Sequence, residues 1–405
     1  MCTFKITNYI DKHITDNKLI LGGPDASNTI DIAGLYITHH LLQVTGEQTI
    51  QPVKSEGLHY LLLGEVYNYD DTLPSDIYYV IDCYEKYGDA FLEHLDGEFL
   101  VIIIDSDVIK FFTDPWGTRQ AWFSKTDEHF YFATYPLNSD KDTRLQNNSQ
   151  YNFDIKTKEL VQINSEIHKW NLNQFKDNID DVTLALEQAI DKRYHPKSFL
   201  LLSGGIDSSV VAVRLADTKK QIQSATINYV NSEDLKTQSQ VIEYCKEYND
   251  NKIFYRPEVE PNFVTEYVEQ YYNQQCKVML TGNGSDEIFC NYHNKPKVMK
   301  PEFDRFPSDL TKVFPWINFY NGHHRKLINR WEIRALTYGL EIRSIFLDKN
   351  LIQEWLNLSV FLKNKEHKYF LKEYLRKKNI NIPNRTAGMK SQSLWEKEYG
   401  HQSSV

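Results

Sequence analysis

The sequence has no apolar run that approaches the length of a membrane span, and its first residues, MCTFKITNYIDKH, lack the apolar stretch of a signal peptide. It also lacks an excess of positive charge. Its 46 Lys and Arg residues are outnumbered by 55 Asp and Glu residues, which gives a net charge of -9. These absences predict a cytoplasmic protein and argue against a nucleic acid or an anionic membrane as its partner.

Cysteine is scarce, with five residues in a chain of 405. Cys2, Cys83, Cys245, Cys276 and Cys290 are odd in number and widely spaced, which is not the spacing of a disulfide framework or a zinc site. We therefore expect reduced thiols.

The remaining composition is that of a globular protein, with 41% hydrophobic and 25% charged residues. A chain of this length predicts about two or three domains, and no internal repeat is visible. The polar stretch NLNQFKDNID, just before residue 180, predicts a linker. It would separate a domain at residues 1–170 from a second domain at residues 180–405.

Strands and helices alternate in the predicted second domain, after a first helix at Asp181–Arg193. The expected strands are Phe199–Leu202, Ile222–Tyr229, Asn251–Tyr255 and Lys277–Leu280, and the expected helices are Ser208–Ala216, Leu235–Glu247 and Phe263–Tyr272. This alternation predicts an α/β fold with a doubly wound parallel sheet. Ligands of such sheets bind beyond the carboxyl ends of the strands.

A small-residue turn follows the first of these strands, in the run SFLLLSGGIDSSVVAVRLAD (Ser198–Asp217). A strand, a glycine-rich turn and a helix with unpaired first N–H groups make a site for phosphate. Asp207 would repel a phosphate, so its presence predicts a metal ion between the two. A simple strand-turn-helix could also contain two glycines and several serines.

The Walker phosphate-binding pattern is absent, but SGGIDSS resembles the pyrophosphate-binding loop of the ATP pyrophosphatases, which split ATP between its α and β phosphates. The resemblance implies ATP and Mg²⁺ as cofactors. The phosphate-binding residues that it implies are Ser203, Gly204, Gly205, Asp207, Ser208 and Ser209.

The segment TGNGSDEIFCNY (Thr281–Tyr292) resembles the Ser-Gly-Glu-Gly-Ala/Ser-Asp-Glu stretch of the asparagine synthetases. The resemblance implies that Gly282 and Gly284 lie at the nucleotide and that Asp286 joins Asp207 as a magnesium ligand. Asn283 stands where that family has Glu and the beta-lactam synthetases have Tyr. A neutral amide cannot act as a general base, so we do not assign that role to it.

Two further segments resemble the same family. TYGLEIRSIFLD (Thr337–Asp348) is similar to Gly-Leu-Glu-x-Arg-x-Pro-Phe-Leu-Asp, which implies a catalytic Glu341, although Glu341 and Arg343 could form a structural ion pair. HKYFLK (His367–Lys372) is similar to Gly-Lys-Tyr-x-Leu-Arg. This implies that Lys368 faces the departing pyrophosphate, where negative charge grows during the reaction. Without the resemblance, the lysines around it would indicate a solvated basic helix.

The first half predicts short strands with few helices. The expected strands include Tyr60–Leu63, Phe99–Ile104, Lys110–Phe112 and Phe130–Thr134, and the expected helices are Ser75–Tyr87 and Phe91–Leu95. The polar segment between Asn138 and Gln150 predicts a loop.

Several pieces of this half resemble the glutaminase domain of the glutamine-hydrolysing asparagine synthetases. They are Met1-Cys2, GGPDAS, GEVYNY, Ser75-Asp76, LDGEFLVIIID and TDPWGTRQAWF, in the family's order. The resemblance implies an α+β N-terminal-nucleophile fold with helix, sheet, sheet and helix layers. It also implies a Cys2 thiol that attacks glutamine once Met1 is removed, with Glu65 and Asp76 binding the glutamine amine.

Three positions depart from the family pattern. Cys2 is followed by Thr3 rather than Gly, Leu63 replaces an Asn that donates to the developing oxyanion, and HHLLQV at His39–Val44 lacks the Arg that holds the glutamine carboxylate. A lost oxyanion donor costs about 3 to 4 kcal/mol in comparable sites. The domain is therefore either a working glutaminase or a degenerate domain with a structural role, as in the beta-lactam synthetases.

Together these motifs imply a ligase that adenylates a small-molecule carboxylic acid and displaces AMP with ammonia, from glutamine or free in solution. A substrate amine could replace the ammonia. Two other classes stay open: a pyrophosphatase that activates a nucleic acid, and a catalytically silent nucleotide-binding protein. A homodimer is compatible with the resemblance.

Overall fold

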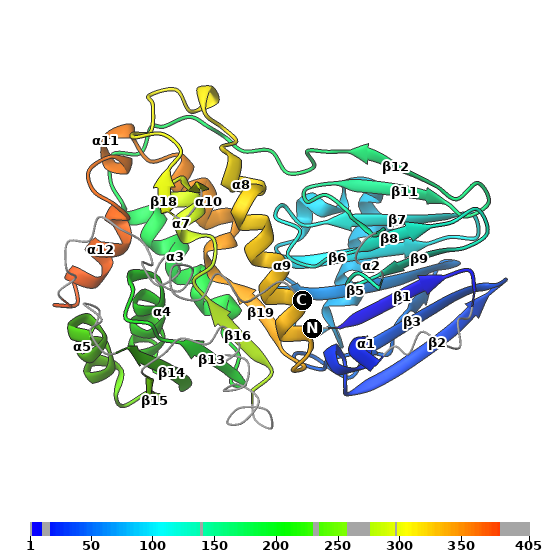
Figure 1. The fold of residues 1–405 in the computed structure, drawn as a ribbon, viewed down its shortest axis with the longest axis horizontal. Helices are drawn as coiled ribbons and strands as arrows, with labels where there is room; N and C mark the ends of the chain where they lie inside the picture. Colours follow the sequence, from blue (N-terminus) through cyan, green and yellow to red (C-terminus); the bar gives the residue numbers. More distant parts are fainter. Residues whose placement is uncertain are drawn as a thin grey trace, which may run out of the picture. The chain divides into compact units, whose positions relative to one another are not determined.

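The computed structural model describes residues 2–9, 17–137, 141–229, 235–256, 276–295 and 298–380. They form two compact units (Figure 1). Unit 1 contains the described residues up to Lys169, with Cys276, Lys277 and Ile328–Ile342, and unit 2 contains the others. The helix expected at Phe263–Tyr272 lies outside the described residues. In the described part of the chain, no helix has the length and apolarity needed to cross a membrane.

Unit 1 is built on two antiparallel sheets. In spatial order, the first contains β10 (Thr143–Arg144), β8 (Trp122–Lys125), β9 (Phe130–Ala133), β1 (Thr3–Thr7), β3 (Leu35–Leu41) and β2 (Ala26–Ile32). The second contains β12 (Glu159–Asn164), β11 (Gln150–Asp154), β7 (Val108–Thr113), β6 (Gly97–Ile104), β5 (Leu58–Val66) and β4 (Val53–Ser55).

The apolar run in β5 is buried on both faces of the second sheet. Leu61 and Leu63 join a core that also holds Phe4 and Ile37 of the first sheet, so the two sheets pack face to face. Leu62 and its neighbours on that face pack beneath α2 (Asp76–Tyr87) and η1 (Gly88–His94). Because side chains alternate along a strand, a continuous apolar run is what such a doubly covered strand requires.

The outer face of the first sheet is covered by α1 (Asn17–Gly22) and by the end of α9 (Gly322–Leu336). Leu19 and Leu336 pack with Tyr135 there, and the Thr3 hydroxyl of β1 donates to the Leu19 carbonyl. Unit 1 therefore has the expected order of helix, sheet, sheet and helix.

The main sheet of unit 2 has the order β15 (Asn249–Arg256), β14 (Ile222–Tyr229), β13 (Ser198–Leu201), β16 (Val278–Thr281) and β19 (Glu341–Ser344). The first two residues of β19 are counted with unit 1. β13 pairs in parallel with both β14 and β16, and β14 with β15. The predicted doubly wound parallel sheet is confirmed. The strand order reverses direction between β13 and β16, which is the switch point where such sheets bind ligands.

Helix α4 (Ile206–Asp217) follows β13 and packs against α3 (Asp180–Arg193), α5 (Leu235–Cys245) and α12 (Tyr369–Arg376). The shorter elements of this unit are α7 (Ser285–Phe289), β17 (Tyr292–Lys295), β18 (Val298–Pro301), η2 (Leu310–Lys312), α8 (Ile317–Tyr320), η3 (Ile345–Leu347), α10 (Lys349–Leu356) and α11 (Val360–Lys363).

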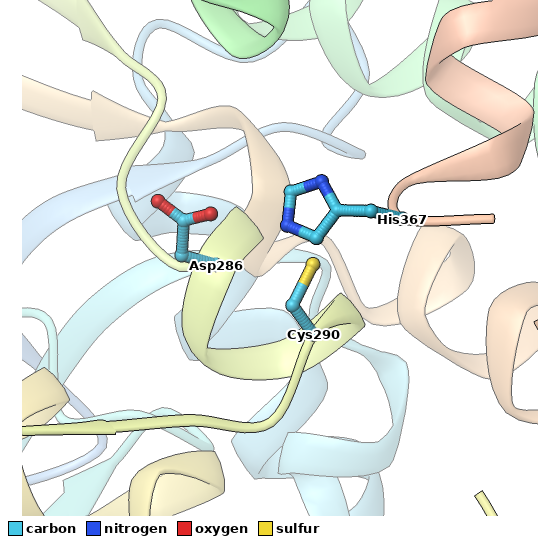
Figure 2. Close-up of side chains that lie close together, drawn as sticks. All are labelled: Asp286, Cys290 and His367. Carbon is cyan, nitrogen blue, oxygen red and sulfur yellow. The ribbon is translucent and has the colours of Figure 1, made fainter. Parts of the chain in front are cut away.

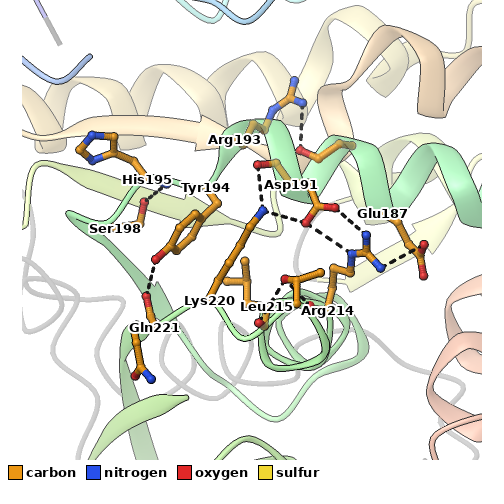
Figure 3. Close-up of polar contacts among 12 residues, drawn as sticks. Glu187, Asp191, Arg193, Tyr194, His195, Ser198, Arg214, Leu215, Lys220 and Gln221 are labelled. Carbon is orange, nitrogen blue, oxygen red and sulfur yellow. Dashed lines mark hydrogen bonds and ion pairs between the residues drawn. The ribbon is translucent and has the colours of Figure 1, made fainter. Parts of the chain in front are cut away.

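A cluster of ion pairs joins α3 to α4 (Figure 3). Asp191 of α3 accepts from Arg214 of α4 at 2.6 Å and from Lys220, beyond the end of α4, at 2.9 Å. Arg214 also pairs with Glu187 at 3.1 Å. These contacts hold α4, whose first turn carries the candidate phosphate loop, against the preceding helix.

A buried ion pair joins the end of α3 to the start of α10. Arg193 Nη1 lies 2.7 Å from Asp348 Oδ2, and both side chains are 1% exposed. Lys192 Nζ lies 2.5 Å from the same oxygen, and Asp348 also accepts from the Leu351 amide as the N-cap of α10. Burial alone would raise the pKa of Asp348, but Arg193 and Lys192 lower it to about 2.

The first testable prediction concerns this carboxylate. Asp348→Asn keeps a capping oxygen but leaves Arg193 without its buried partner, which should cost about 3–5 kcal/mol at neutral pH. A depressed pKa gives stability that is complete above the unfolded value of 3.8 and is lost as the pH falls toward about 2. The wild-type advantage should therefore be constant above about pH 5 and shrink below pH 4.

The free energy of unfolding of unit 2, measured in urea for both proteins from pH 7 to pH 3, gives this difference. Asp309→Asn is the matched control, because Asp309 caps the short η2 without a buried cation. Its cost should stay below about 1 kcal/mol. A difference between wild type and Asp348→Asn that does not change with pH would contradict the assignment.

Candidate functional site

Two polar loops begin at the carboxyl ends of β13 and β16. Since these strands are parallel neighbours, with Leu200 paired to Leu280, both loops emerge at the same edge of the sheet. The chain adopts a left-handed conformation in each loop, at Gly204 (φ 79°) and at Gly284 (φ 93°). Glycine adopts this conformation without steric cost, which explains the residue type at both positions.

The first loop, SGGIDSS, is closed by its own hydroxyl groups. The Ser203 amide donates to Ser208 Oγ at 3.2 Å, the two serine hydroxyls lie 3.1 Å apart, and the Gly205 amide donates to Ser203 Oγ at 3.2 Å. No side chain caps the start of α4 at Gly205, so its first amides are available to an anion. Ser209 Oγ is buried and has no hydrogen-bond partner among the described residues. This arrangement suits a phosphate group.

The glycines of the second loop allow close packing, Gly282 against the first loop and Gly284 against η3. A Cβ atom on Gly282 would lie 2.9 Å from Asp207 Cβ, and one on Gly284 would lie 2.5 Å from Leu347 Cδ2. Both separations are too short for carbon atoms in contact. A side chain at Gly282 would therefore push the second loop away from the first, and one at Gly284 would push it away from Leu347.

Lys368 joins the two loops. Its Nζ lies 2.8 Å and 2.7 Å from the two carboxylate oxygens of Asp207 and 2.7 Å from Asp286 Oδ1. Its side chain is 3% exposed, whereas those of Asp207 and Asp286 are 21% and 34% exposed. Ser285 Oγ donates to Asp207 Oδ1 at 2.7 Å. The structure thus brings together the three residues that separate sequence motifs indicated.

Lys368 adopts a left-handed main-chain conformation, with φ 53° and ψ 43°, at the start of α12. A residue other than glycine rarely occupies this region, and doing so costs about 1–3 kcal/mol. The surrounding contacts must offset this cost. Such strain gathers at functional sites because it aims a side chain that an ordinary conformation would direct elsewhere.

Burial alone would lower the pKa of Lys368, but Asp207 and Asp286 outweigh it and raise the pKa above its usual value. Lys368 is therefore a permanent cation. Burial raises the pKa of Asp207, and the nearby Asp286 adds to the rise. Burial and Asp286 also raise the pKa of Glu287 to about 7.

Two carboxylates thus contact one ammonium group, which leaves an excess of negative charge. Asp207 and Asp286 present oxygen atoms, the ligands that Mg²⁺ prefers, and a divalent ion would relieve their repulsion. The donor set fits magnesium held jointly by these two residues and by phosphate oxygens.

Glu341 is the first residue of β19 and is counted with unit 1. It is 2% exposed. Burial alone would lower the pKa of Arg119, but Glu332 and Glu341 raise it. Arg119 Nη1 lies 2.6 Å from Glu332 Oε1, and its Nη2 donates to the Ile342 carbonyl at 2.8 Å. The catalytic role expected for Glu341 stays a prediction.

Cys2 is 8% exposed and packs in the core between the two sheets of unit 1, in the same cluster as Leu63. Its thiol lies 3.8 Å from the Leu42 carbonyl, to which it donates. Burial raises the pKa of the thiol to about 11, and Glu341 and Asp76 add to the rise. An apolar Leu63 in this core supplies no donor to a developing oxyanion.

Glu65 and Asp76, the expected ligands of the glutamine amine, bind neighbouring groups of the protein. Glu65 accepts a hydrogen bond from the Thr45 hydroxyl, and Asp76 accepts from the Val66 amide at 3.0 Å. In the stretch that lacks the family's Arg, His39 is 1% exposed. Burial, followed by the neighbouring His40, lowers the pKa of His39 to about 3, so it supplies no positive charge for a glutamine carboxylate.

Ser285, Cys290 and His367 also lie at this site, although the motifs that contain them assigned them no role. Ser285 could have been found from its place beside Asp286. No spacing rule joins Cys290 to His367, because they belong to different motifs.

Comparison with known proteins places these motifs in context. Residues 181–338 match the family described as asparagine synthase. The putative glutamine-hydrolyzing asparagine synthetase 1 of Methanocaldococcus jannaschii is 26% identical over 400 residues, which cover 83% of this chain and 71% of that protein. The probable enzyme of Schizosaccharomyces pombe is 25% identical over 420 residues, covering 87% and 74%.

A glutamine phosphoribosylpyrophosphate amidotransferase from B. subtilis has 10% identity and a TM-score of 0.34, over 70% of this chain and 75% of that one. Similarity at this level adds nothing to the fold described above. The sequence matches carry the conclusion: the predicted resemblance of the chain to the glutamine-hydrolysing asparagine synthetases is confirmed.

Proposed function

We propose that the chain is an AMP-forming carbon-nitrogen ligase that converts a small carboxylic acid into an amide. The main support is the position of Lys368, which contacts the carboxylates of Asp207 and Asp286 across two loops at the switch point of the sheet. A buried cation beside a phosphate-type loop matches the charge that develops as pyrophosphate departs from ATP.

The reaction has two steps. An oxygen of the substrate carboxylate attacks the α-phosphorus of ATP, the bond to the bridging oxygen breaks, and pyrophosphate leaves with its electron pair. A nitrogen nucleophile then attacks the acyl carbon, AMP leaves with the electrons of the acyl-oxygen bond, and the nitrogen releases a proton to solvent.

The residues of unit 2 have separate roles in this proposal. Amides and hydroxyls of the loop at Ser203–Ser209 bind the phosphates. Gly282 keeps the second loop close to the first, and Gly284 lets it pack against Leu347. Asp207 and Asp286 would hold a magnesium ion, which would neutralise phosphate charge. Lys368 would exchange part of its contact with these carboxylates for the oxygens of the leaving pyrophosphate.

The residues around Cys2 favour a nitrogen source other than glutamine. The oxyanion lacks the donor that Leu63 replaces, and His39–Val44 contains no Arg to hold a glutamine carboxylate. We infer that free ammonia or a substrate amine attacks the adenylate and that unit 1 is a degenerate glutaminase. A catalytically silent nucleotide-binding protein would not require a strained Lys368.

The proposed partners are small molecules. A net charge of -9 favours neither a nucleic acid nor an anionic membrane surface. The cytoplasmic location and a possible homodimeric state stay predictions.

The second testable prediction concerns Lys368. Lys368→Met keeps most of the side-chain length and removes the charge, and it should lower kcat for pyrophosphate release at least about 100-fold, the typical cost of one lost transition-state contact. The assay is pyrophosphate release from ATP over a panel of carboxylic acids with ammonium present. Lys368→Arg, which keeps the charge, should retain more activity than the Met variant.

Lys365→Met is the matched control, because Lys365 is exposed and contacts only the Tyr369 hydroxyl and ring in the described structure. It should change kcat less than about twofold. Circular dichroism checks that each variant is folded. A folded Lys368→Met enzyme with wild-type turnover would refute the role of Lys368.

The third testable prediction concerns nitrogen. Cys2→Ala should leave ammonium-dependent pyrophosphate release unchanged, and glutamine should not replace ammonium for the wild-type protein. The reason is the missing oxyanion donor, worth about 3 to 4 kcal/mol, or about 100- to 1,000-fold in rate. Glutamate release from glutamine is measured alongside. Glutamate production by the wild type that Cys2→Ala abolishes would show that unit 1 is a working glutaminase.

A further inference from the structure

Three side chains of unit 2 meet beside the Lys368 cluster (Figure 2). They are Asp286 in the first turn of α7, Cys290 at the end of that helix, and His367, the residue before Lys368. One ligand atom from each lies within 4.8 Å of the others. The three side chains converge on a common point although two distant parts of the chain supply them.

His367 lacks the partners that a partly buried imidazole normally has. Neither of its ring nitrogens has a hydrogen-bond partner among the described residues. The ring lies over Tyr292, with centroids 5.4 Å apart and planes inclined by 28°, so its orientation is fixed by stacking. Buried polar atoms are rarely left unsatisfied, and two on one ring indicate a ligand that the ring is placed to bind.

Cys290 gives the cluster its chemical character. It is 7% exposed and unpaired with any other cysteine. A thiolate, an imidazole nitrogen and a carboxylate oxygen form a mixed donor set that suits zinc or cobalt(II), whereas magnesium prefers oxygen alone. Two anionic ligands would neutralise a divalent ion, and the neutral imidazole would complete three of its four positions.

We propose that Asp286, Cys290 and His367 form a binding site for a zinc-type divalent ion, distinct from the magnesium site but sharing Asp286 with it. The ion replaces the thiol proton of Cys290, which leaves to solvent, and a water molecule fills the fourth position. The cysteine spacing gave no sign of such a site because its histidine comes from another motif.

Sharing one carboxylate couples this site to the Lys368 cluster. Asp286 Oδ1 lies 2.7 Å from Lys368 Nζ, and an ion on Asp286 competes for that carboxylate with Lys368 and with magnesium. Bound zinc therefore acts as an inhibitor that raises the magnesium requirement. This consequence depends on the proposed ligase function, whereas metal binding itself does not.

The fourth testable prediction is metal binding by the full chain without substrates. Metal-free protein titrated with Co²⁺ should bind about one ion and develop the near-ultraviolet charge-transfer absorption of a thiolate ligand. Cys290→Ala should abolish that band. Cys290→Ala and His367→Gln should each lower the affinity for Co²⁺ at least about 10-fold, because loss of a residue that only orients a metal ligand already lowers affinity by about that much. Competition with Zn²⁺ gives the zinc affinity.

Cys245→Ala is the matched control, because Cys245 is another buried cysteine of unit 2 that lies outside the cluster. It should keep both the band and the affinity. A wild-type protein without the thiolate band, or a folded Cys290→Ala variant that keeps it, would overturn the proposal. Should Cys290→Ala fail to fold, an unchanged Co²⁺ affinity in His367→Gln would overturn it as well.

A second arm separates this site from the proposed ligase. Zn²⁺ should inhibit wild-type pyrophosphate release, excess Mg²⁺ should reverse the inhibition, and His367→Gln should be inhibited at least about 10-fold less strongly. Cobalt binding without any pyrophosphate release would refute the ligase and leave the metal site standing. Inhibition that is identical in wild type and His367→Gln would refute the coupling between the two sites.

Discussion

The buried contact of one lysine with two aspartates organises the candidate site. Lys368 holds Asp207 and Asp286, which follow β13 and β16, and its own main chain is left-handed at the start of α12. Without a cation between them, two carboxylates on adjacent loops would repel each other. A buried ion pair adds little net stability, because desolvation offsets its attraction. Its value here is a fixed positive charge, ready where pyrophosphate would leave.

Local patterns predicted the fold well where burial follows one strand or helix. The Ser75 start of a helix matches α2, which begins at Asp76 with Ser75 as its N-cap. The prediction of a continuous loop between Asn138 and Gln150 was wrong, because Thr143–Arg144 forms β10 and pairs with β8. A strand of two residues is too short to show the alternation of apolar and polar residues by which strands are predicted. That Leu336 packs in unit 1, far along the chain from Leu19, also depends on tertiary contacts that local patterns do not record.

For the candidate site, the sequence motifs predicted which residues take part better than they predicted how those residues are arranged in space. Asp207, Asp286 and Lys368 came from three separate motifs, and parallel strand ends explain why the two aspartates meet. The lysine's conformation and the proximity of Cys290 to His367 could not be predicted, because no spacing along the chain encodes them. Glu341 shows that a close motif match does not fix a role. Its motif predicted catalysis, yet in the described structure its charge raises the pKa values of Arg119 and Cys2.

A crystal structure with Mg²⁺ and an ATP analogue that cannot be cleaved between the α and β phosphates would test the central claim most directly. We expect the β and γ phosphates at the amides of Gly204 to Ser209, the metal on Asp207 and Asp286, and the Lys368 ammonium turned toward a phosphate oxygen. A triphosphate bound elsewhere, with Lys368 still locked onto both carboxylates, would contradict the account.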